Sequence, residues 1–298
     1  MFHRQHLCTG HRSALYSLSS SHTSRHFLSA GGDGWITEWN IDQPETGRVV
    51  INVESQVFSL AVSPPEWSDA CILAGNMLGG LHWVDRQHPE ETRNILHHQK
   101  SIYDILWLGE EVFTAGGDGQ VTRWEATRKK PVESFQLSNR SIRALAYSPS
   151  EDLLAAGASD GNIYLLHRRD FTLERTISAH DNSVFTLAWS PDGKRLFSGG
   201  RDAHLKVWDI SGDNLSSQSA HWFTINHISF SPNGAYFATA SRDKTIKIWD
   251  AATLALVKVL ETIRDNGHLN SVNRLLWTEN YLISCSDDRT VILFSYER

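Results

Sequence analysis

The stretch Ala179–Ile210, AHDNSVFTLAWSPDGKRLFSGGRDAHLKVWDI, contains the pattern from which the rest of the chain is built. It predicts three short strands joined by tight turns. The first strand places apolar side chains at Val184, Leu187 and Trp189, and this spacing of three and then two residues indicates a bulge. The tetrapeptides Ser-Pro-Asp-Gly and Gly-Gly-Arg-Asp that follow are turn sequences, and residues 204–208 alternate between polar and apolar as a strand does.

The pattern repeats along the whole chain of 298 residues with a period of about 42 residues. The position of Trp208 recurs at Trp39, Trp83, Trp124, Leu166, Trp249 and Phe294. The position of Asp202, six residues earlier, recurs at Asp33, Asp118, Asp160, Asp243 and Asp288, whereas the second unit has Met77 there. Residues 1–298 therefore predict a single domain of seven units, bounded at about 8–53, 54–96, 97–137, 138–177, 178–219, 220–260 and 261–298 plus 1–7.

Both ends of the chain are expected to share the last unit. Residues 2–7 resemble a lone strand, and every unit except the seventh carries a fourth strand after its Trp position. An unpaired sheet edge is a liability, and joining the two ends would remove it. The N-terminal strand is therefore predicted to complete the seventh sheet.

Composition limits the class of protein. The net charge of -6 argues against a general binder of nucleic acid, which is usually basic. The three cysteines, Cys8, Cys71 and Cys285, are too few and too scattered for a disulfide framework or a cysteine-rich metal site. No signal peptide and no apolar run of membrane-spanning length is seen, so we expect a cytoplasmic protein of a reducing compartment, with no membrane partner.

Four polar or aromatic positions recur together. In the fifth unit they are His180, Ser198, Asp202 and Trp208; in the first His11, Ser29, Asp33 and Trp39; and in the sixth His221, Thr239, Asp243 and Trp249. The third unit has His97 (with His98 as an alternative), Thr114, Asp118 and Trp124, and the seventh has His268, Ser284, Asp288 and Phe294. Such groups could satisfy one another beneath a turn. A hydrolase triad is disfavoured, because a nucleophile and its base are needed once and not five times.

These residues resemble the WD-repeat β-propeller family. Trp208-Asp209 and Trp249-Asp250 are its Trp-Asp dipeptide, and Gly10-His11, Ala179-His180 and Gly267-His268 resemble its Gly-His element. The resemblance implies an all-β, seven-bladed propeller with four antiparallel strands per blade, in which the His, Ser/Thr, Asp and Trp set is structural. The second unit lacks the Asp and the hydroxyl (Met77, Leu73), and the fourth has Ala156, Leu166 and no His, so both are expected to depend more on packing.

The resemblance also implies a partner-binding rim, with two positions per blade facing it. The first set, at the strand bulge, is Tyr16, Phe58, Tyr103, Arg143, Phe185, Asn226 and Asn273. The second set, just before the Asp, is Gly32, Asn76, Gly117, Ser159, Arg201, Arg242 and Asp287. Aromatic and arginine side chains favour a binding surface for a peptide with an acidic or aromatic anchor. The alternative is that the aromatics pack around a tunnel entrance and the arginines pair with acids such as Asp160 or Asp287.

The favoured function is a non-catalytic protein-interaction scaffold or complex subunit. The alternatives are a propeller enzyme with a site at the tunnel mouth, and a reader of phosphorylated or acidic ligands through Arg143, Arg201 and Arg242. No catalytic residue, metal ligand or cofactor is predicted, and the histidines His82, His88, His97 and His98 lack the spacing of a metal site. Trp67 and the pair Trp222-Phe223 stay open between exposed anchors and local core.

Overall fold

The computed structural model describes residues 2–67 and 70–296. Within these residues the strands form seven four-stranded sheets, one for each unit of the sequence pattern. Neighbouring strands in each sheet run antiparallel and, in the first six sheets, follow one another in chain order. The sheets are the blades of a β-propeller, so the predicted fold class is confirmed. The contacts within the chain divide it into two compact units.

The N-terminal unit covers residues 7–142 and 289–291 and holds the first three blades. Its strands are β2 (Leu15–Ser20), β3 (His26–Gly31), β4 (Trp35–Asn40) and β5 (Gln43–Asn52) in blade one; β6 (Val57–Val62), β7 (Cys71–Asn76), β8 (Gly80–Asp85) and β9 (Arg93–Leu96) in blade two; and β10 (Ile102–Leu108), β11 (Glu111–Gly116), β12 (Gln120–Glu125) and β13 (Lys130–Gln136) in blade three. A single turn of 3₁₀ helix, η1 (Pro89–Glu91), precedes β9.

The C-terminal unit covers residues 143–288 with segments from both ends of the chain. Its strands are β14 (Ile142–Ser148), β15 (Leu153–Ala158), β16 (Asn162–His167) and β17 (Leu173–Ser178) in blade four; β18 (Val184–Trp189), β19 (Arg195–Gly200), β20 (His204–Asp209) and β21 (Asn214–Ser219) in blade five; β22 (Ile225–Phe230), β23 (Tyr236–Ser241), β24 (Ile246–Asp250) and β25 (Leu256–Leu260) in blade six; and β26 (Val272–Trp277), β27 (Tyr281–Ser286), β28 (Val291–Tyr296) and β1 (Phe2–Cys8) in blade seven. The short helix α1 (Thr262–Asp265) lies between β25 and β26.

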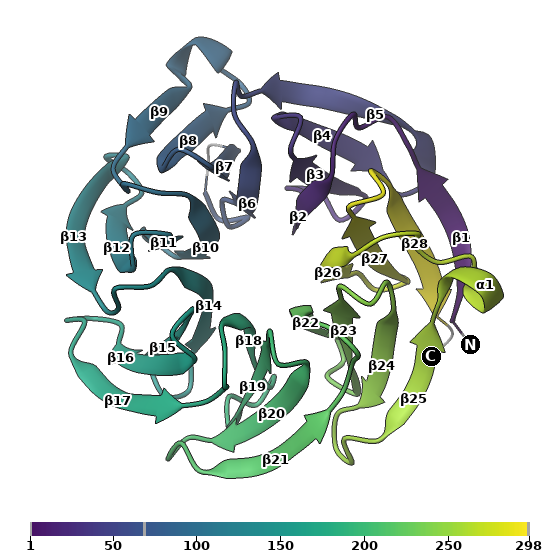
Figure 1. Ribbon diagram of the computed structural model, residues 1–298. Coiled ribbons are helices and arrows are strands. Elements are labelled where there is room, and N and C mark those ends of the chain that lie inside the picture. The colour runs from purple at the N-terminus through teal and green to yellow at the C-terminus, as the bar shows by residue number, and fades with distance from the viewer. Residues whose placement is uncertain (1, 68–69, 297–298) are drawn as a thin grey trace. The chain divides into compact units, whose positions relative to one another are not determined.

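Blade seven contains strands from both ends of the chain. Its order is β1-β28-β27-β26, and Figure 1 shows the purple β1 beside the yellow β28. The Phe2 ring stacks on Tyr296 at 5.7 Å between centroids and meets Trp277 edge-on at 6.1 Å. Burial of these three rings stabilises the pairing, and the prediction that the N-terminal strand completes the last sheet is confirmed.

The first strand of the blades is bulged, as its apolar spacing predicts. In blade five the partner of Val184 is Gly200 and the partner of Thr186 is Gly199, so Phe185 has no partner on the neighbouring strand. The bulge in other blades likewise leaves one residue without a partner on the neighbouring strand: Tyr16, Phe58, Tyr103, Asn226 and Asn273. A bulge re-aims the side chain of its extra residue, which is why these positions differ in role from the apolar residues on either side.

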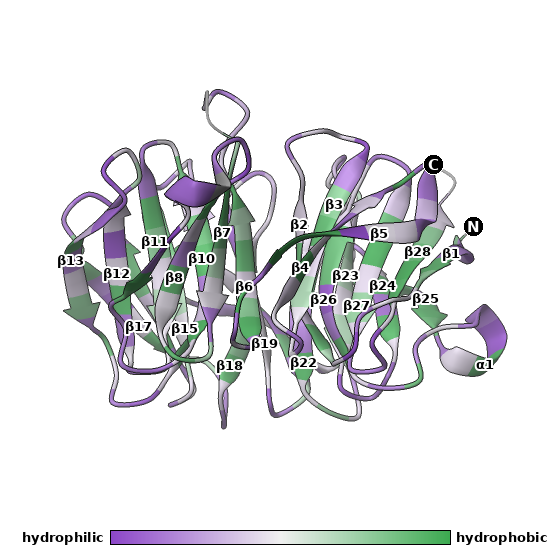
Figure 2. Ribbon diagram, turned by 90° about the horizontal axis from the view of Figure 1, so that it is seen from above, coloured by the Kyte–Doolittle hydropathy of each residue, from purple (hydrophilic) through white to green (hydrophobic). Residues whose placement is uncertain are grey.

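The core lies between neighbouring blades of each unit. The second strands β7 and β15 are buried along their full length, whereas the fourth strands β13 and β17 are mostly exposed. In the N-terminal unit, Trp83 of blade two and Ile102, Ile105 and Trp124 of blade three form one apolar cluster. Figure 2 shows that hydrophobic residues (green) lie mainly in the strands, whereas many of the connecting turns are hydrophilic (purple).

The register of blade two corrects the sequence alignment. Val57 pairs with Asn76 as Val184 pairs with Gly200 in blade five, which makes Asn76 the equivalent of Gly200. The equivalents of Ser198, Asp202 and Trp208 are therefore Ala74, Leu78 and Val84, and the assignment of Leu73, Met77 and Trp83 to these positions is wrong.

This shift of one residue changes the face on which Trp83 lies, because successive side chains of a strand point to opposite faces. Val84 packs against Ile36 of blade one, as the family tryptophan packs toward the preceding blade. Trp83 instead packs toward blade three, with its ring centroid 6.4 Å from that of Trp124. The Asn76 side chain accepts hydrogen bonds from the amides of Leu78 and Gly80 and so holds a turn that has no aspartate.

Candidate functional site

A chain of buried hydrogen bonds crosses each blade that keeps the four recurring positions. In blade six, Trp249 Nε1 donates to Thr239 Oγ1 at 3.0 Å, and Thr239 Oγ1 lies 2.7 Å from His221 Nε2. His221 Nδ1 lies 2.9 Å from Asp243 Oδ2. A neutral imidazole offers one donor and one acceptor, so the threonine hydroxyl donates to Nε2 and Nδ1–H donates to the carboxylate. Every group in the chain is then satisfied.

The electrostatics agree with this assignment. Burial lowers the pKa of His221 below its ordinary value, although the neighbouring Asp243 carboxylate acts in the opposite direction. Burial alone would raise the pKa of Asp243, but hydrogen bonds from His221, Thr245 and the Trp222 amide outweigh it and hold that pKa far below the ordinary value. The ring is therefore neutral and the carboxylate ionised at neutral pH.

The same chain recurs in four other blades. It runs through Trp39, Ser29, His11 and Asp33 in blade one, through Trp124, Thr114, His98 and Asp118 in blade three, and through Trp208, Ser198, His180 and Asp202 in blade five. In blade seven, Ser284, His268 and Asp288 are joined without a tryptophan. The choice of His97 for blade three is wrong and the alternative, His98, is right; His97 Nε2 instead lies 2.8 Å from Ser134 Oγ.

This chain of hydrogen bonds has the geometry of a structural support. Ser29, Ser198 and Thr239 are completely buried, so no substrate can approach their hydroxyls. The aspartate also accepts a hydrogen bond from the backbone amide that follows the histidine, Trp222 N to Asp243 at 3.1 Å in blade six. It thereby joins the turn between two strands of a blade to the loop that enters the blade.

In the N-terminal unit, three predicted rim residues form a continuous aromatic row, defined as Tyr16, Phe58 and Tyr103. Their ring centroids are 5.1 Å apart between Tyr16 and Phe58 and 5.6 Å between Phe58 and Tyr103. All three side chains are half-buried. A Cβ on Gly117 would lie 3.2 Å from the Tyr103 ring, so the glycine before the aspartate leaves space for the aromatic residue.

In the C-terminal unit, the predicted rim residues of blades four and five contact one another. The Arg143 guanidinium lies 4.6 Å from the centre of the Phe185 ring, and Arg143 Nε donates to Ser159 Oγ at 2.8 Å. A cation placed over an aromatic face is attracted by the ring, and this fixes the direction of the guanidinium. Arg143 is therefore held in place by its neighbours.

Arg201 and Arg242 differ from Arg143. Both are exposed, and neither guanidinium makes a hydrogen bond or ion pair with another residue in the described part of the chain. The carboxylates expected as their partners are engaged elsewhere: Tyr164 donates to Asp160 at 2.8 Å, and Asn273 donates to Asp287 at 2.7 Å.

The remaining rim positions have structural contacts. Asn226 Nδ2 donates to the Val272 carbonyl at 2.9 Å and so links blades six and seven. Asn273 is joined to Asp287, as described above. Asn76, included in the rim through the misalignment of blade two, is buried, and the exposed Met77 occupies the corresponding position.

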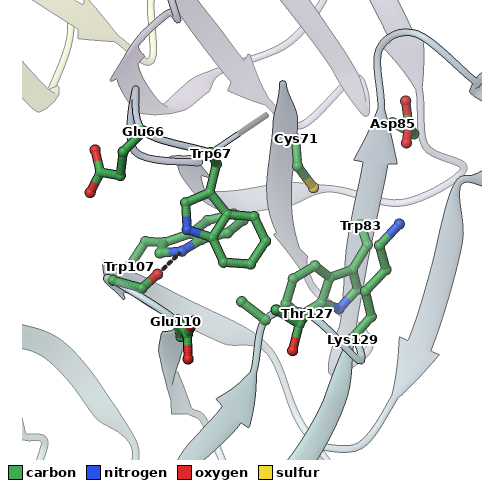
Figure 3. A pocket seen from close by; sticks show the side chains of 11 residues that line it. Glu66, Trp67, Cys71, Trp83, Asp85, Trp107, Glu110, Thr127 and Lys129 are labelled. Carbon is green, nitrogen blue, oxygen red and sulfur yellow. Dashed lines mark hydrogen bonds between the residues drawn. The ribbon is translucent and has the colours of Figure 1, made fainter. Parts of the chain in front are cut away.

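The two tryptophan-containing segments that the sequence left undecided differ in exposure. Trp222 and Phe223 are 87% and 59% exposed and lie on the loop that enters blade six. Trp67 is half-buried and meets Trp107 edge-on, with ring centroids 5.3 Å apart. Beside Trp67 lies a pocket of about 520 Å³, shown in Figure 3, that the sequence did not predict.

Comparison with known proteins agrees with this geometry. The family model "WD domain, G-beta repeat" matches residues 3–40, 129–166, 171–209, 212–250 and 257–295, which is more than half of the chain. The chain belongs to the WD-repeat family of β-propellers. The unmatched residues 41–128 include blade two, which lacks the polar chain, and most of blade three, which keeps it.

Similar proteins include the following three. The Dictyostelium discoideum "Anaphase-promoting complex subunit cdh1" is 29% identical over 152 residues, which is 49% of this chain and 20% of that protein. The Schizosaccharomyces pombe "WD repeat-containing protein slp1" is 25% identical over 201 residues, 64% of this chain and 40% of that protein. The Trichoplax adhaerens "Ribosome biogenesis protein WDR12 homolog" is 33% identical over 120 residues, 38% of this chain and 28% of that protein. The matched region is thus less than half of each relative.

Within residues 2–67 and 70–296, no group of three or more His, Cys, Asp or Glu side chains is arranged to hold a metal ion. Over the same ranges, no helix has the length and apolar character needed to cross a membrane. Cys8, Cys71 and Cys285 are free thiols in the interior.

Proposed function

We propose that this chain is a non-catalytic protein-interaction subunit that binds a protein or peptide partner at the rim. The observation that carries the proposal is the aromatic row of Tyr16, Phe58 and Tyr103, which runs across three neighbouring blades and keeps part of each ring exposed. Aromatic side chains supply a large contact area with few rotatable bonds and are enriched where partners bind.

The unpaired arginines favour an acidic anchor on the partner. Arg201 and Arg242 are exposed on neighbouring blades and have no carboxylate to neutralise them among the residues described. A guanidinium binds carboxylate or phosphate through paired hydrogen bonds. A partner with acidic or phosphorylated residues therefore fits this side of the rim, and Arg143, already held by Phe185 and Ser159, contributes less.

The relatives support a role inside an assembly. One of them is named as a subunit of the anaphase-promoting complex. Because the matched region is only a fifth of that protein, membership of any complex is for this chain a proposal. Its three cysteines are free thiols, which supports the proposal that it acts in a reducing compartment.

The proposal is tested by quantitative affinity capture with the double variant Phe58→Ala, Arg201→Glu. We expect the variant to lose the proteins that the unmodified chain captures, while its melting temperature stays within about 2 °C. Lys194→Glu is the matched control, because it makes the same charge change on an exposed residue at the other end of blade five. Equal capture by the double variant and the unmodified chain would show that the rim is not the binding surface. Steep loss of capture with added salt would favour the acidic anchor over an aromatic one.

A further inference from the structure

The pocket beside Trp67 lies at the opposite end of the strands from the rim. Its walls come from the turn after β6, the start of β7, the end of β8, the turn between β10 and β11, and the turn after β12. Its volume of about 520 Å³ is within the range of ordinary ligand sites. All of these segments belong to the N-terminal unit, so the site is complete within blades two and three.

Tryptophan side chains form one side of the pocket. Trp67 and Trp107 meet at 73°, and Trp83 lies behind them, fully buried, with its ring 5.9 Å from that of Trp107. Trp107 Nε1 donates to the Gly109 carbonyl at 2.9 Å, the dashed line in Figure 3, and this bond fixes the ring. Two partly exposed indoles at a steep angle therefore offer a preformed aromatic corner.

The charged residues of the lining are mostly acidic. Glu66, Asp85 and Glu110 line the pocket together with a single cation, Lys129. Glu66 and Glu110 are exposed, and their carboxylates have no hydrogen bond or ion pair with any residue of the described ranges. Hydrogen bonds from the His88 and Gln87 amides hold the pKa of Asp85 below its ordinary value, so it is ionised at neutral pH. The pocket carries more negative than positive charge.

We propose that this pocket binds an organic cation, presented as the basic side chain of a partner segment: lysine, methylated lysine or arginine. The cationic head would lie against Trp67 and Trp107, where the ring faces attract positive charge, and near the carboxylates of Glu66 and Glu110. The alkyl stem would fill the apolar part of the pocket. An anionic ligand would be repelled by the three carboxylates, and an apolar ligand would gain no electrostatic attraction from them. The site is independent of the rim and adds a second contact surface.

The probes are four capped peptides, Gly-Gly-X-Gly-Gly, in which X is lysine, trimethyllysine, arginine or norleucine. Binding is followed by NMR of the indole N–H signals of the ¹⁵N-tryptophan-labelled protein, with Trp67→Ala and Trp107→Phe used to assign the signals. We expect the cationic peptides to shift both signals and to bind at least fivefold more tightly than the norleucine peptide. The order among the three cations identifies the head group that the site prefers.

Three variants test which residues contribute to binding of the cationic peptides. Trp67→Ala should weaken cation binding at least tenfold, whereas Trp222→Ala, which removes an exposed tryptophan outside the pocket, should leave it unchanged. The double variant Glu66→Gln, Glu110→Gln should weaken binding at least threefold and reduce its salt dependence, and it carries the test if Trp67→Ala does not fold. The proposal is overturned if norleucine binds as tightly as lysine, if neither pocket variant weakens binding, or if no peptide shifts the indole signals at 10 mM. None of these outcomes depends on capture at the rim.

Discussion

Replacing Asp243 with alanine tests the idea that the buried polar chain stabilises the blades. The Asp243 carboxylate accepts hydrogen bonds from His221 Nδ1 at 2.9 Å, Thr245 Oγ1 at 2.6 Å and the backbone amides of Trp222 and Thr245 at 3.1 and 3.0 Å. The alanine variant loses all four and leaves the buried imidazole without its carboxylate. Asp160 is the matched control, because it is exposed and occupies the same turn of blade four, where Ser138 stands at the position of the recurring histidine.

The structure sets the size of the effect. A hydrogen bond to a charged group contributes about 1.5–3 kcal/mol, and a buried donor left without its partner costs about 1–3 kcal/mol. Allowing for partial replacement by water and by Thr245, Asp243→Ala should lower the free energy of unfolding by about 3–4 kcal/mol. Asp160→Ala loses exposed contacts, among them the hydrogen bonds from the Asn162 amide and the Tyr164 hydroxyl, and should cost about 1 kcal/mol.

Thermal and urea unfolding, followed by circular dichroism, measure both variants. At about 2–4 °C per kcal/mol, the melting temperature should fall by roughly 10 °C for Asp243→Ala and by about 3 °C for Asp160→Ala. The double variant His221→Ala, Asp243→Ala should cost at least about 1 kcal/mol less than the sum of the single variants, because the two residues share one interaction. Equal losses for Asp243→Ala and Asp160→Ala, or strict additivity in the double variant, would refute the reasoning.

Three further outcomes are expected. First, the free energy of unfolding should fall as the pH drops below about 6.5, because the pKa of His221 is lower in the folded state and the unfolded chain therefore takes up the proton first. A second fall should begin near pH 4, because the pKa of Asp243 is also lower in the folded state than in the unfolded chain. Urea midpoints that stay level between pH 7 and 3 would contradict both expectations. Second, Gly119→Ala should cost at least about 2 kcal/mol in urea unfolding, because Gly119 has φ +86° and a Cβ there would collide with a backbone carbonyl oxygen. Third, Trp249→Phe should lower the free energy of unfolding by about 1–2 kcal/mol more than Trp83→Phe, measured by urea unfolding. The reason is that Trp249 Nε1 donates to a buried hydroxyl, whereas the buried Trp83 Nε1 has no partner in the described residues. Equal losses for the two variants would contradict this reason.

The sequence predicts most of the fold because its determinants are local and repeated. The turn of Gly200, Arg201 and Asp202 specifies a hairpin by itself, and its recurrence about every 42 residues counts the blades without any knowledge of tertiary contacts. The missing fourth strand after Phe294 was enough to predict where Phe2–Cys8 pairs. In each case the information lies within a few neighbouring residues.

Blade two was misaligned because its aspartate is absent and Trp83 stood where a tryptophan was expected. A signal for the right register exists in Gly79. Glycine follows the aspartate at Gly34, Gly119 and Gly161, each with positive φ, so Gly79 marks Leu78 as the equivalent of the aspartate. The backbone requirement for glycine survived in this turn although the side-chain chemistry did not.

The pocket of blades two and three was beyond sequence reasoning for a different reason. Its lining comes from segments near Trp67, Trp83, Trp107 and Lys129, which are far apart in the chain and meet only through packing of neighbouring blades. The sequence Pro64-Pro65 before Trp67 stands where blade five has the turn Ser-Pro-Asp-Gly, but the direction of this segment depends on contact with Trp107. At the rim, likewise, the sequence identified the bulge residues, while the coupling of Arg143 to Phe185 required the structure.

The shared sheet of blade seven has a consequence for biosynthesis. A ribosome makes β1 before every other strand described here and β28 after every other, so β1 has no partner until all the other described strands have been made. During that interval a solitary strand with Phe2 at its start is open to pairing with other nascent chains. We therefore expect β1 to be among the last of the described strands to acquire its native neighbours, and to be the strand that most needs protection by chaperones.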